Sequence, residues 1–226
     1  VKMFRDTLNQ SLTAHPYLDT VTVYGSTLGT SPSLPFPTIT HNTEIIFCQY
    51  DTLVAHRKIR EIDSSSKIAL VDFANIQSPG GTPQFGSPAQ EEKIVYRTNL
   101  FLPIYSLYQM NKDKSSPLHK LNQIPGISVN HFYPETGGVY IPNVTQFKEF
   151  KEEMKADQKS VVPFFTPTKL NIIASAAFNY NTRGRTRPIP PRERGGPPIG
   201  VTKDSKDYEI LTKAKMRSQL RIALLN

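Results

Sequence analysis

The fold of this chain is decided by residues 71–100, which read VDFANIQSPGGTPQFGSPAQEEKIVYRTNL. The largely apolar residues 67–73 run into a glycine pair at residues 80–81, and a Gln-Glu-Glu tripeptide at residues 90–92 then opens a second segment. A short apolar run of this kind predicts a strand that is buried on both faces of a sheet. The sequence therefore predicts a strand, a bare backbone turn and the start of a helix, in that order.

The predicted helix carries signals for its own first turn. Ser87 can act as the N-cap, Pro88 occupies the first helical position where its missing N–H costs nothing, and Gln90 completes a capping box. The helix is expected to run from about residue 89 to residue 96 or beyond. Pro103 is expected to end or kink it, because proline cannot donate the backbone hydrogen bond that a helix interior needs.

A strand and a helix are also predicted upstream of the central strand. Residues 44–49 (EIIFCQ) have strand composition, and Asp51 is a plausible N-cap for a helix over residues 52–62. Together with residues 67–73 these elements predict a βαβ unit, with a right-handed crossover by default. The chain is thus expected to have an α/β fold.

The remaining regions divide the chain into an N-terminal accessory arm, residues 1–42, and a main domain, residues 43–226. Within them the sequence predicts two short strands, a second central strand, a long surface loop rich in arginine, proline and glycine, and a C-terminal helix. In chain order these lie at residues 21–24 and 139–141 (short strands), 169–177 (second central strand), 178–204 (loop) and 205–225 (helix).

Composition limits the classes of function. The chain has 226 residues, 38% of them apolar, and a net charge of +8, which favours polyanionic partners such as nucleotides, ADP-ribose chains or nucleic acid. Cys48 is the single cysteine, so no intramolecular disulfide can form, and we expect a reducing, intracellular compartment, cytoplasmic or nuclear. The five histidines lack metal-ligand spacing, and no window resembles a membrane span, so neither a metal site nor a membrane partner is predicted.

The glycine turn and the two carboxylates are each ambiguous when taken alone. A tight turn explains Gly80 and Gly81, and acids in the first turn of a helix often do no more than complement its dipole. Together they are more informative, because acids beside a phosphate cradle fit a ligand with both a phosphate region and a sugar region. Adjacent helical residues point about 100° apart. Glu91 and Glu92 are therefore expected to have different roles, one binding a hydroxyl and one facing a glycosidic oxygen.

The motifs VDFAN, PGG and AQEE, in this order and spacing, resemble the signature of the poly(ADP-ribose) glycohydrolases, in particular their microbial-type branch. The segments TEIIFCQYDTLVAHRKI and VYIPNVTQFK resemble elements that flank this signature. The resemblance implies a macrodomain-like fold, a mixed sheet between helices, that binds ADP-ribose. It further implies hydrolysis of poly(ADP-ribose) or removal of ADP-ribose from modified proteins, as in the response to DNA damage.

The resemblance also assigns roles to single residues. Glu92 corresponds to the catalytic acid that acts on the ribose–ribose O-glycosidic bond through an oxocarbenium-like transition state, and Glu91 corresponds to the carboxylate that binds ribose hydroxyls. No cofactor and no metal are implied. The predicted substrate-binding residues are those of the strand end, the glycine loop and the helix start: Asp72, Asn75, Gly80, Gly81, Thr82 and Gln90.

This chain departs from the family pattern in two places. Thr82 stands where the family loop has a third glycine, and its Cβ restricts the backbone and can crowd the ligand. The family also has a further strand and a second glycine-rich loop after the helix predicted at residues 205–225, a C-terminal part that we expect to be absent here. We expect this part either to have been cut away, to be supplied by a complementing C-terminal fragment or a second chain, or to be replaced at the sheet edge by the N-terminal arm.

Two other functions fit the sequence. A non-catalytic ADP-ribose reader on the same fold is favoured by Thr82 and by the expected absence of the last strand. An RNA-binding protein would instead use the basic residues of the 178–204 loop, with Phe178 and Tyr180 as stacking groups.

Overall fold

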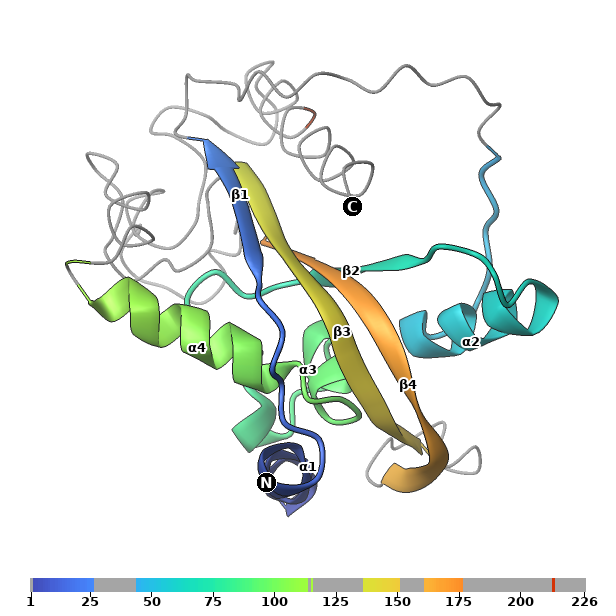
Figure 1. Cartoon of the computed structure of the whole chain (residues 1–226), viewed down its shortest axis with the longest axis horizontal. Helices are drawn as coiled ribbons and strands as arrows, with labels where there is room; N and C mark the ends of the chain where they lie inside the picture. The colour runs from blue at the N-terminus through green and yellow to red at the C-terminus, as the bar shows by residue number, and fades with distance from the viewer. Residues whose placement is uncertain are drawn as a thin grey trace, which may run out of the picture.

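The computed structural model describes residues 2–26, 44–113, 115, 136–150, 161–176 and 213. The long loop predicted at residues 178–204 lies outside the described residues, as does the predicted C-terminal helix apart from Lys213. Figure 1 shows the described part as a long, twisted sheet with helices packed around it.

The described strands form one mixed sheet. Its strands, in spatial order, are β1 (Thr22–Ser26), β3 (Thr136–Phe150), β4 (Val161–Ser175) and β2 (Ala69–Phe73). The β1–β3 and β3–β4 pairs are antiparallel, whereas β4 and β2 are parallel. The predicted α/β class with a mixed sheet is therefore confirmed. The predicted strands at residues 21–24, 67–73, 139–141 and 169–177 all fall within or largely within these four strands.

The helices are distributed around this sheet. In chain order they are α1 (Lys2–Thr13), α2 (Thr52–Ile62), α3 (Gln90–Val95) and α4 (Phe101–Lys112), with a 3-10 turn at Pro83–Phe85. In Figure 1, α2 lies on the β2 and β4 side of the sheet, and α4 lies on the β1 side. Among the described helices, none combines the length and the apolar character that crossing a bilayer requires.

The hydrophobic core forms where α2, α3 and α4 pack against the sheet. Each of these helices contributes fully buried aliphatic side chains, and so do β3 and β4: Leu53, Ile94, Leu100, Ile104, Val139, Ile141, Val144 and Ile172. Burying one such side chain is worth about 1.5–3 kcal/mol. The short α3 carries Glu91 and Glu92, the acid pair. It is anchored in the core through the buried side chains of Ile94 and Val95.

The N-terminal segment packs onto the same core. The Thr7 hydroxyl of α1 donates to the Tyr96 carbonyl at 2.8 Å, and the buried ammonium of Lys148 lies 2.6 Å from the Asp6 carboxylate. Its strand β1 pairs with β3, and β4 lies between β3 and β2 in the described sheet. The N-terminal arm therefore adds a strand to the sheet, but beside β3 and not beside β4. The division into an accessory arm and a main domain stays a prediction.

The helix α2 begins as its sequence predicts. Asp51 is the N-cap, and its side chain accepts a hydrogen bond from the Leu53 N–H at 3.0 Å. The strand predicted at residues 44–49 is wrong, because residues 44–50 have no regular structure and Phe47 is 94% exposed. Strand preference is realised only against a paired and packed neighbour, and the parallel neighbour of β2 is β4.

The predicted start and end of the acid-bearing helix are also corrected. The N-cap of α3 is Ala89, not Ser87, and no side chain caps the helix. The helix ends at Val95, well before Pro103, which lies in the first turn of the separate helix α4. Proline is tolerated there because the first N–H groups of a helix have no partner within it.

Candidate active site

The loop between β2 and α3 depends on glycine at two adjacent positions. Gly80 and Gly81 have φ angles of 68° and 73°, in the left-handed region that side chains disfavour. A Cβ atom at Gly81 would collide with the Glu92 carboxylate, and one at Gly80 would press on the Phe101 ring. The loop backbone therefore lies directly against the acid pair, as the predicted site requires.

Both acids are buried in the protein. Glu91 is 3% exposed and Glu92 is 4% exposed, so neither is a solvated residue that merely complements the helix dipole. The Glu91 carboxyl accepts from the Asn75 N–H at 2.8 Å, whereas the Glu92 carboxyl accepts from the Thr82 N–H at 2.9 Å. The two neighbours thus bind different segments of the loop, because their side chains leave the helix in different directions.

A third carboxyl group, that of Asp72, is fully buried in β2. Neither of its oxygens has a hydrogen-bond partner, and burial together with the charge of Glu92 raises the pKa of Asp72 to about 7. Burial and the charge of Asp72 raise the pKa of Glu91 to about 10, against the opposing effect of the Asn75 N–H. Glu91 is therefore a neutral carboxylic acid at pH 7, which can donate a hydrogen bond as well as accept one.

Gln90 bonds the edge of β2. Its side-chain oxygen accepts from the Phe73 N–H at 2.9 Å, and its amide nitrogen donates to the Val71 carbonyl at 2.7 Å and to the Thr52 hydroxyl at 3.3 Å. The amide completes a strand edge much as a neighbouring strand would, and it fixes the start of α3 to the sheet. The predicted contact of Gln90 with substrate stays a prediction.

Two of the other predicted binding residues shape the loop. The side-chain oxygen of Asn75 accepts from the backbone N–H groups of Gln77 and Ser78, at 2.9 and 3.0 Å, and so forms the turn that precedes the glycines. Thr82 has a φ angle of −130°, which any residue adopts without strain. The threonine that replaces the family glycine is therefore compatible with this backbone.

Sequence reasoning missed two residues that lie directly after the acid-bearing helix α3. The Tyr96 hydroxyl donates 3.1 Å hydrogen bonds to the carbonyls of Pro83 and Ser87, and burial with the charge of Glu92 raises the pKa of Tyr96 to about 12. Tyr96 follows Glu92 by four residues, a spacing that indicates a shared helix face. Arg97 is 1% exposed and binds the end of α3, and no local pattern distinguishes it from a surface arginine.

The arrangement combines a glycine loop with three buried carboxyl groups, and the pKa values of two of them, Asp72 and Glu91, are raised. Such a set can bind an oxygen-rich ligand through neutral and charged groups and can transfer a proton to a leaving oxygen. Within the described ranges, no group of three or more His, Cys, Asp or Glu side chains is arranged to hold a metal ion.

Comparison with known proteins identifies the family. The model of the microbial-type poly(ADP-ribose) glycohydrolase catalytic domain matches residues 7–149, and no curated protein matches the chain. The fold is similar to that of the poly(ADP-ribose) glycohydrolase of Thermomonospora curvata, with a TM-score of 0.56 and 15% identity over 99% of this chain and 65% of that one. The structure of the same enzyme bound to the inhibitor ADP-HPD is similar with a TM-score of 0.50 and 18% sequence identity, over 78% of this chain and 52% of that one.

This chain thus spans between about half and two thirds of the length of the solved relatives. The family match covers well over half of the chain, and it includes the strand, the glycine loop and the helix with its acid pair. The resemblance seen in the sequence is confirmed, and the chain belongs to the microbial-type poly(ADP-ribose) glycohydrolase catalytic-domain family.

Proposed function

We propose that this chain hydrolyses the ribose–ribose O-glycosidic bonds of poly(ADP-ribose) and releases ADP-ribose, with Glu92 as the general acid and base. The observation that carries the proposal is the position of Glu92, which is 4% exposed and bound to the Thr82 N–H of the glycine loop. Family membership supports it, and the related Thermomonospora enzyme has been solved with an inhibitor bound.

The proposed mechanism begins with binding. The backbone of the loop around Gly80 and Gly81, which carries no side chains there, lies against the diphosphate, and the neutral carboxyl group of Glu91 contacts a ribose hydroxyl. One Glu91 oxygen, Oε1, is buried and makes no hydrogen bond among the described residues that meets the usual geometry. Asp72 and Asn75 complete the proposed binding set.

The chemical step uses the second acid. In its protonated form Glu92 gives its proton to the oxygen that leaves the scissile ribose, and an oxocarbenium-like sugar forms as the C–O bond breaks and Glu92 becomes a carboxylate. The same carboxylate then removes a proton from the attacking water, whose oxygen bonds to the anomeric carbon. The bond to the Thr82 N–H, together with the Gly81 backbone pressed against the carboxylate, fixes the rotation of Glu92 for both transfers.

A macrodomain-like fold and a role in reversing ADP-ribosylation, including that formed after DNA damage, are part of this proposal. Poly(ADP-ribose) and ADP-ribosylated proteins are the proposed partners, with a complementing chain at the sheet edge as a further one. The RNA-binding alternative depends on residues 178–204, which lie outside the described residues.

A non-catalytic reader is the second candidate. It is favoured by the two contacts of Thr82 with Glu92, since the threonine hydroxyl also lies 3.4 Å from the same carboxylate oxygen and can hold it away from a substrate. A reader would bind ADP-ribose through the same loop and would leave the polymer intact.

The test is the release of ADP-ribose from a poly(ADP-ribosyl)ated protein by this chain and by its Glu92→Ala variant. Release by the parent chain that the variant lacks would support hydrolysis. Binding of ADP-ribose without any release would favour the reader, and the absence of both would contradict the two candidates together.

A further inference from the structure

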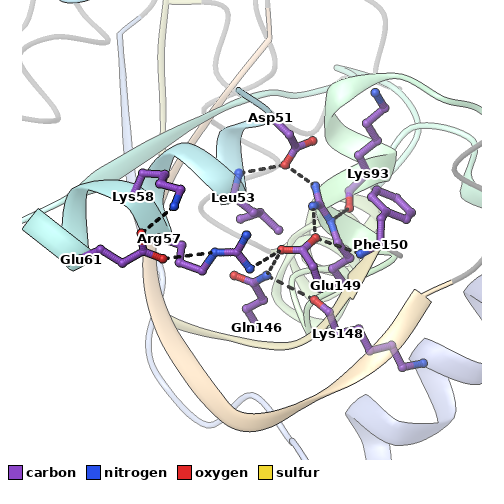
Figure 2. Close-up of polar contacts among 11 residues, drawn as sticks. Asp51, Leu53, Arg57, Lys58, Glu61, Lys93, Gln146, Lys148, Glu149 and Phe150 are labelled. Atoms are coloured by element: carbon purple, nitrogen blue, oxygen red, sulfur yellow. Dashed lines mark hydrogen bonds and ion pairs between the residues drawn. The ribbon is translucent and has the colours of Figure 1, made fainter. Parts of the chain in front are cut away.

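A buried arginine lies directly after the acid-bearing helix. Arg97 is among the largest fully buried side chains of the described residues, with 1% of its surface exposed. Its guanidinium donates to three acceptors on three elements: the Lys93 carbonyl of α3 at 2.9 Å, Asp51 at the N-cap of α2 at 2.7 Å, and Glu149 of β3 at 2.7 Å. Figure 2 labels the partners Asp51, Lys93 and Glu149, and the Arg97 guanidinium lies over the Phe150 ring, 4.5 Å from its centroid.

The positive and negative charges of this cluster are balanced, but burying them costs desolvation free energy. Asp51 and Glu149 are 24% and 16% exposed, and Arg57, which is 40% exposed, adds a weaker 3.7 Å contact to Glu149. The desolvation penalty of a buried guanidinium offsets much of the free energy that its ion pairs contribute. An apolar side chain of similar volume can therefore often replace such a group without loss of stability. What the charged cluster adds is a defined geometry, because the planar donor fork fits one orientation of its carboxylate partners.

The backbone of Arg97 makes a second connection to the sheet. Its carbonyl accepts from the N–H groups of Phe147 and Lys148, at 3.1 and 3.2 Å. These residues lie at the irregularity of β3 where the register with β4 shifts between Gln146 and Lys148. Side chain and backbone of Arg97 therefore hold the end of α3 against α2 and against a fixed point of β3.

The other end of α3 is fixed to β2. Gln90 bonds the N–H of Phe73 and the carbonyl of Val71, so the helix is tied to the sheet at its first residue and just after its last. The helix has six residues, and Glu91 and Glu92 lie between the two ties. With so short a helix, a rotation at the Arg97 end would move both carboxylates.

We propose that Arg97 is a positioning residue for the site: it orients α3 so that Glu91 and Glu92 reach the N–H groups of Asn75 and Thr82. The catalytic part of this inference rests on the proposed function, whereas the position of the two carboxylates does not. Misplacing a catalytic group by about 1 Å costs about a hundredfold in rate.

The test needs a variant that can displace the Glu91 and Glu92 carboxylates without unfolding the protein. Arg97→Met alone would leave Asp51 and Glu149 without their cation, so the test uses Arg97→Met combined with Asp51→Asn and Glu149→Gln. This triple variant keeps the volume of the cluster, removes all three charges together and retains asparagine as a good N-cap for α2. Arg57→Met is the matched control, because Arg57 belongs to the same cluster but has no contact with α3 among those the structure describes.

Hydrogen exchange at the Thr82 and Asn75 amides gives the first readout, since each amide donates to one of the two acids. We expect the triple variant to lose protection at both amides by about tenfold or more while amides of β3 and β4 stay protected, and Arg57→Met to lose none. Full protection at both amides in the triple variant would overturn the proposal, whether or not the chain is an enzyme.

Kinetics give the second readout. In the triple variant we expect kcat for ADP-ribose release to fall about a hundredfold with an unchanged melting temperature, and KM to rise by up to about tenfold because Glu91 is displaced together with Glu92. A wild-type kcat would overturn the proposal. If the parent chain releases no ADP-ribose, the proposed function fails, and the exchange measurement alone decides whether Arg97 positions the acids.

Discussion

The backbone N–H of Thr82 donates a 2.9 Å hydrogen bond to the carboxyl group of Glu92. This bond joins the glycine loop to the acid-bearing helix, ten residues further along the chain. The carboxylate is held on one side by this N–H and on another by the Gly81 backbone, where no Cβ could be accommodated. The loop and the acid are therefore one structural unit, and a change in either is expected to disturb the other.

Gly81→Ala should disrupt this unit. The new Cβ would collide with the Glu92 carboxylate, and alanine would also be strained at a φ of 73°, so we expect loss of ADP-ribose release and a destabilisation of about 2 kcal/mol or more. Gly86→Ala is the control, because Gly86 has a φ of 79° but open space around it. That variant should lose about 1–2 kcal/mol by chemical denaturation and keep its activity. Equal activity of the two variants would show that contact with Glu92 does not matter.

Glu92→Gln is expected to separate binding from catalysis. Glutamine has nearly the same shape, and its carbonyl oxygen can still accept from the Thr82 N–H, so the loop should keep its conformation. A lost general acid lowers turnover by about a hundredfold or more. Calorimetry with ADP-ribose should give an affinity close to that of the parent chain. Parallel losses of affinity and turnover would count against the assigned role.

Glu91→Ala should weaken binding instead. Its carboxyl group bonds the Asn75 N–H and is proposed to contact a ribose hydroxyl, and the variant removes both contacts, so we expect a fall in ADP-ribose affinity of about tenfold. The comparison with Glu92→Gln in the same titration shows whether the two neighbours have different roles.

Thr82→Gly tests the departure from the family loop. Removing the methyl group should give the ligand more space and raise the affinity for ADP-ribose or the rate of its release. The folded protein loses the hydroxyl contact with Glu92, and the unfolded chain gains freedom, so the free energy of unfolding should fall by about 1 kcal/mol. Titration with ADP-ribose and thermal unfolding measure the two effects separately. Unchanged or weaker binding would mean that the threonine contributes to the site by itself.

Asp72→Asn should change how stability depends on pH. The pKa of Asp72 rises from 3.8 to about 7 on folding, so the folded state binds more protons than the unfolded state between these values. The contribution of Asp72 to the free energy of unfolding is fully present below about pH 4 and is lost as pH rises through about 7. Between these values the free energy of unfolding falls by up to about 1.4 kcal/mol per pH unit. In Asp72→Asn the slope from urea unfolding between pH 4 and pH 7 should fall by up to about 1.4 kcal/mol per pH unit, and the part that remains should come from Glu91, whose pKa is also raised. An unchanged slope would show that Asp72 is ionised throughout this range.

Several local elements carry their own signals and could be predicted from the amino-acid sequence. Asp51 ahead of an amphipathic segment fixed the start of α2, and the apolar run into Gly80 and Gly81 fixed β2 and its turn. The glycine pair and the acid pair that follows it each have an ordinary structural explanation, but their combination predicted a site, and both glycines have positive φ angles in the structure. These features also sufficed to indicate the family.

Which segments meet depends on long-range packing and could not be predicted from local sequence. Residues 44–49 have the composition of a strand yet have no regular structure, while β4 became the parallel neighbour of β2 because strand pairing depends on long-range packing and not on local preference. The burial of Asp72, and with it the raised pKa, depends on the helices that cover the sheet. The contacts of Arg97 with Asp51 and Glu149 join residues 46 and 52 positions apart, and no local pattern encodes a contact at such a separation.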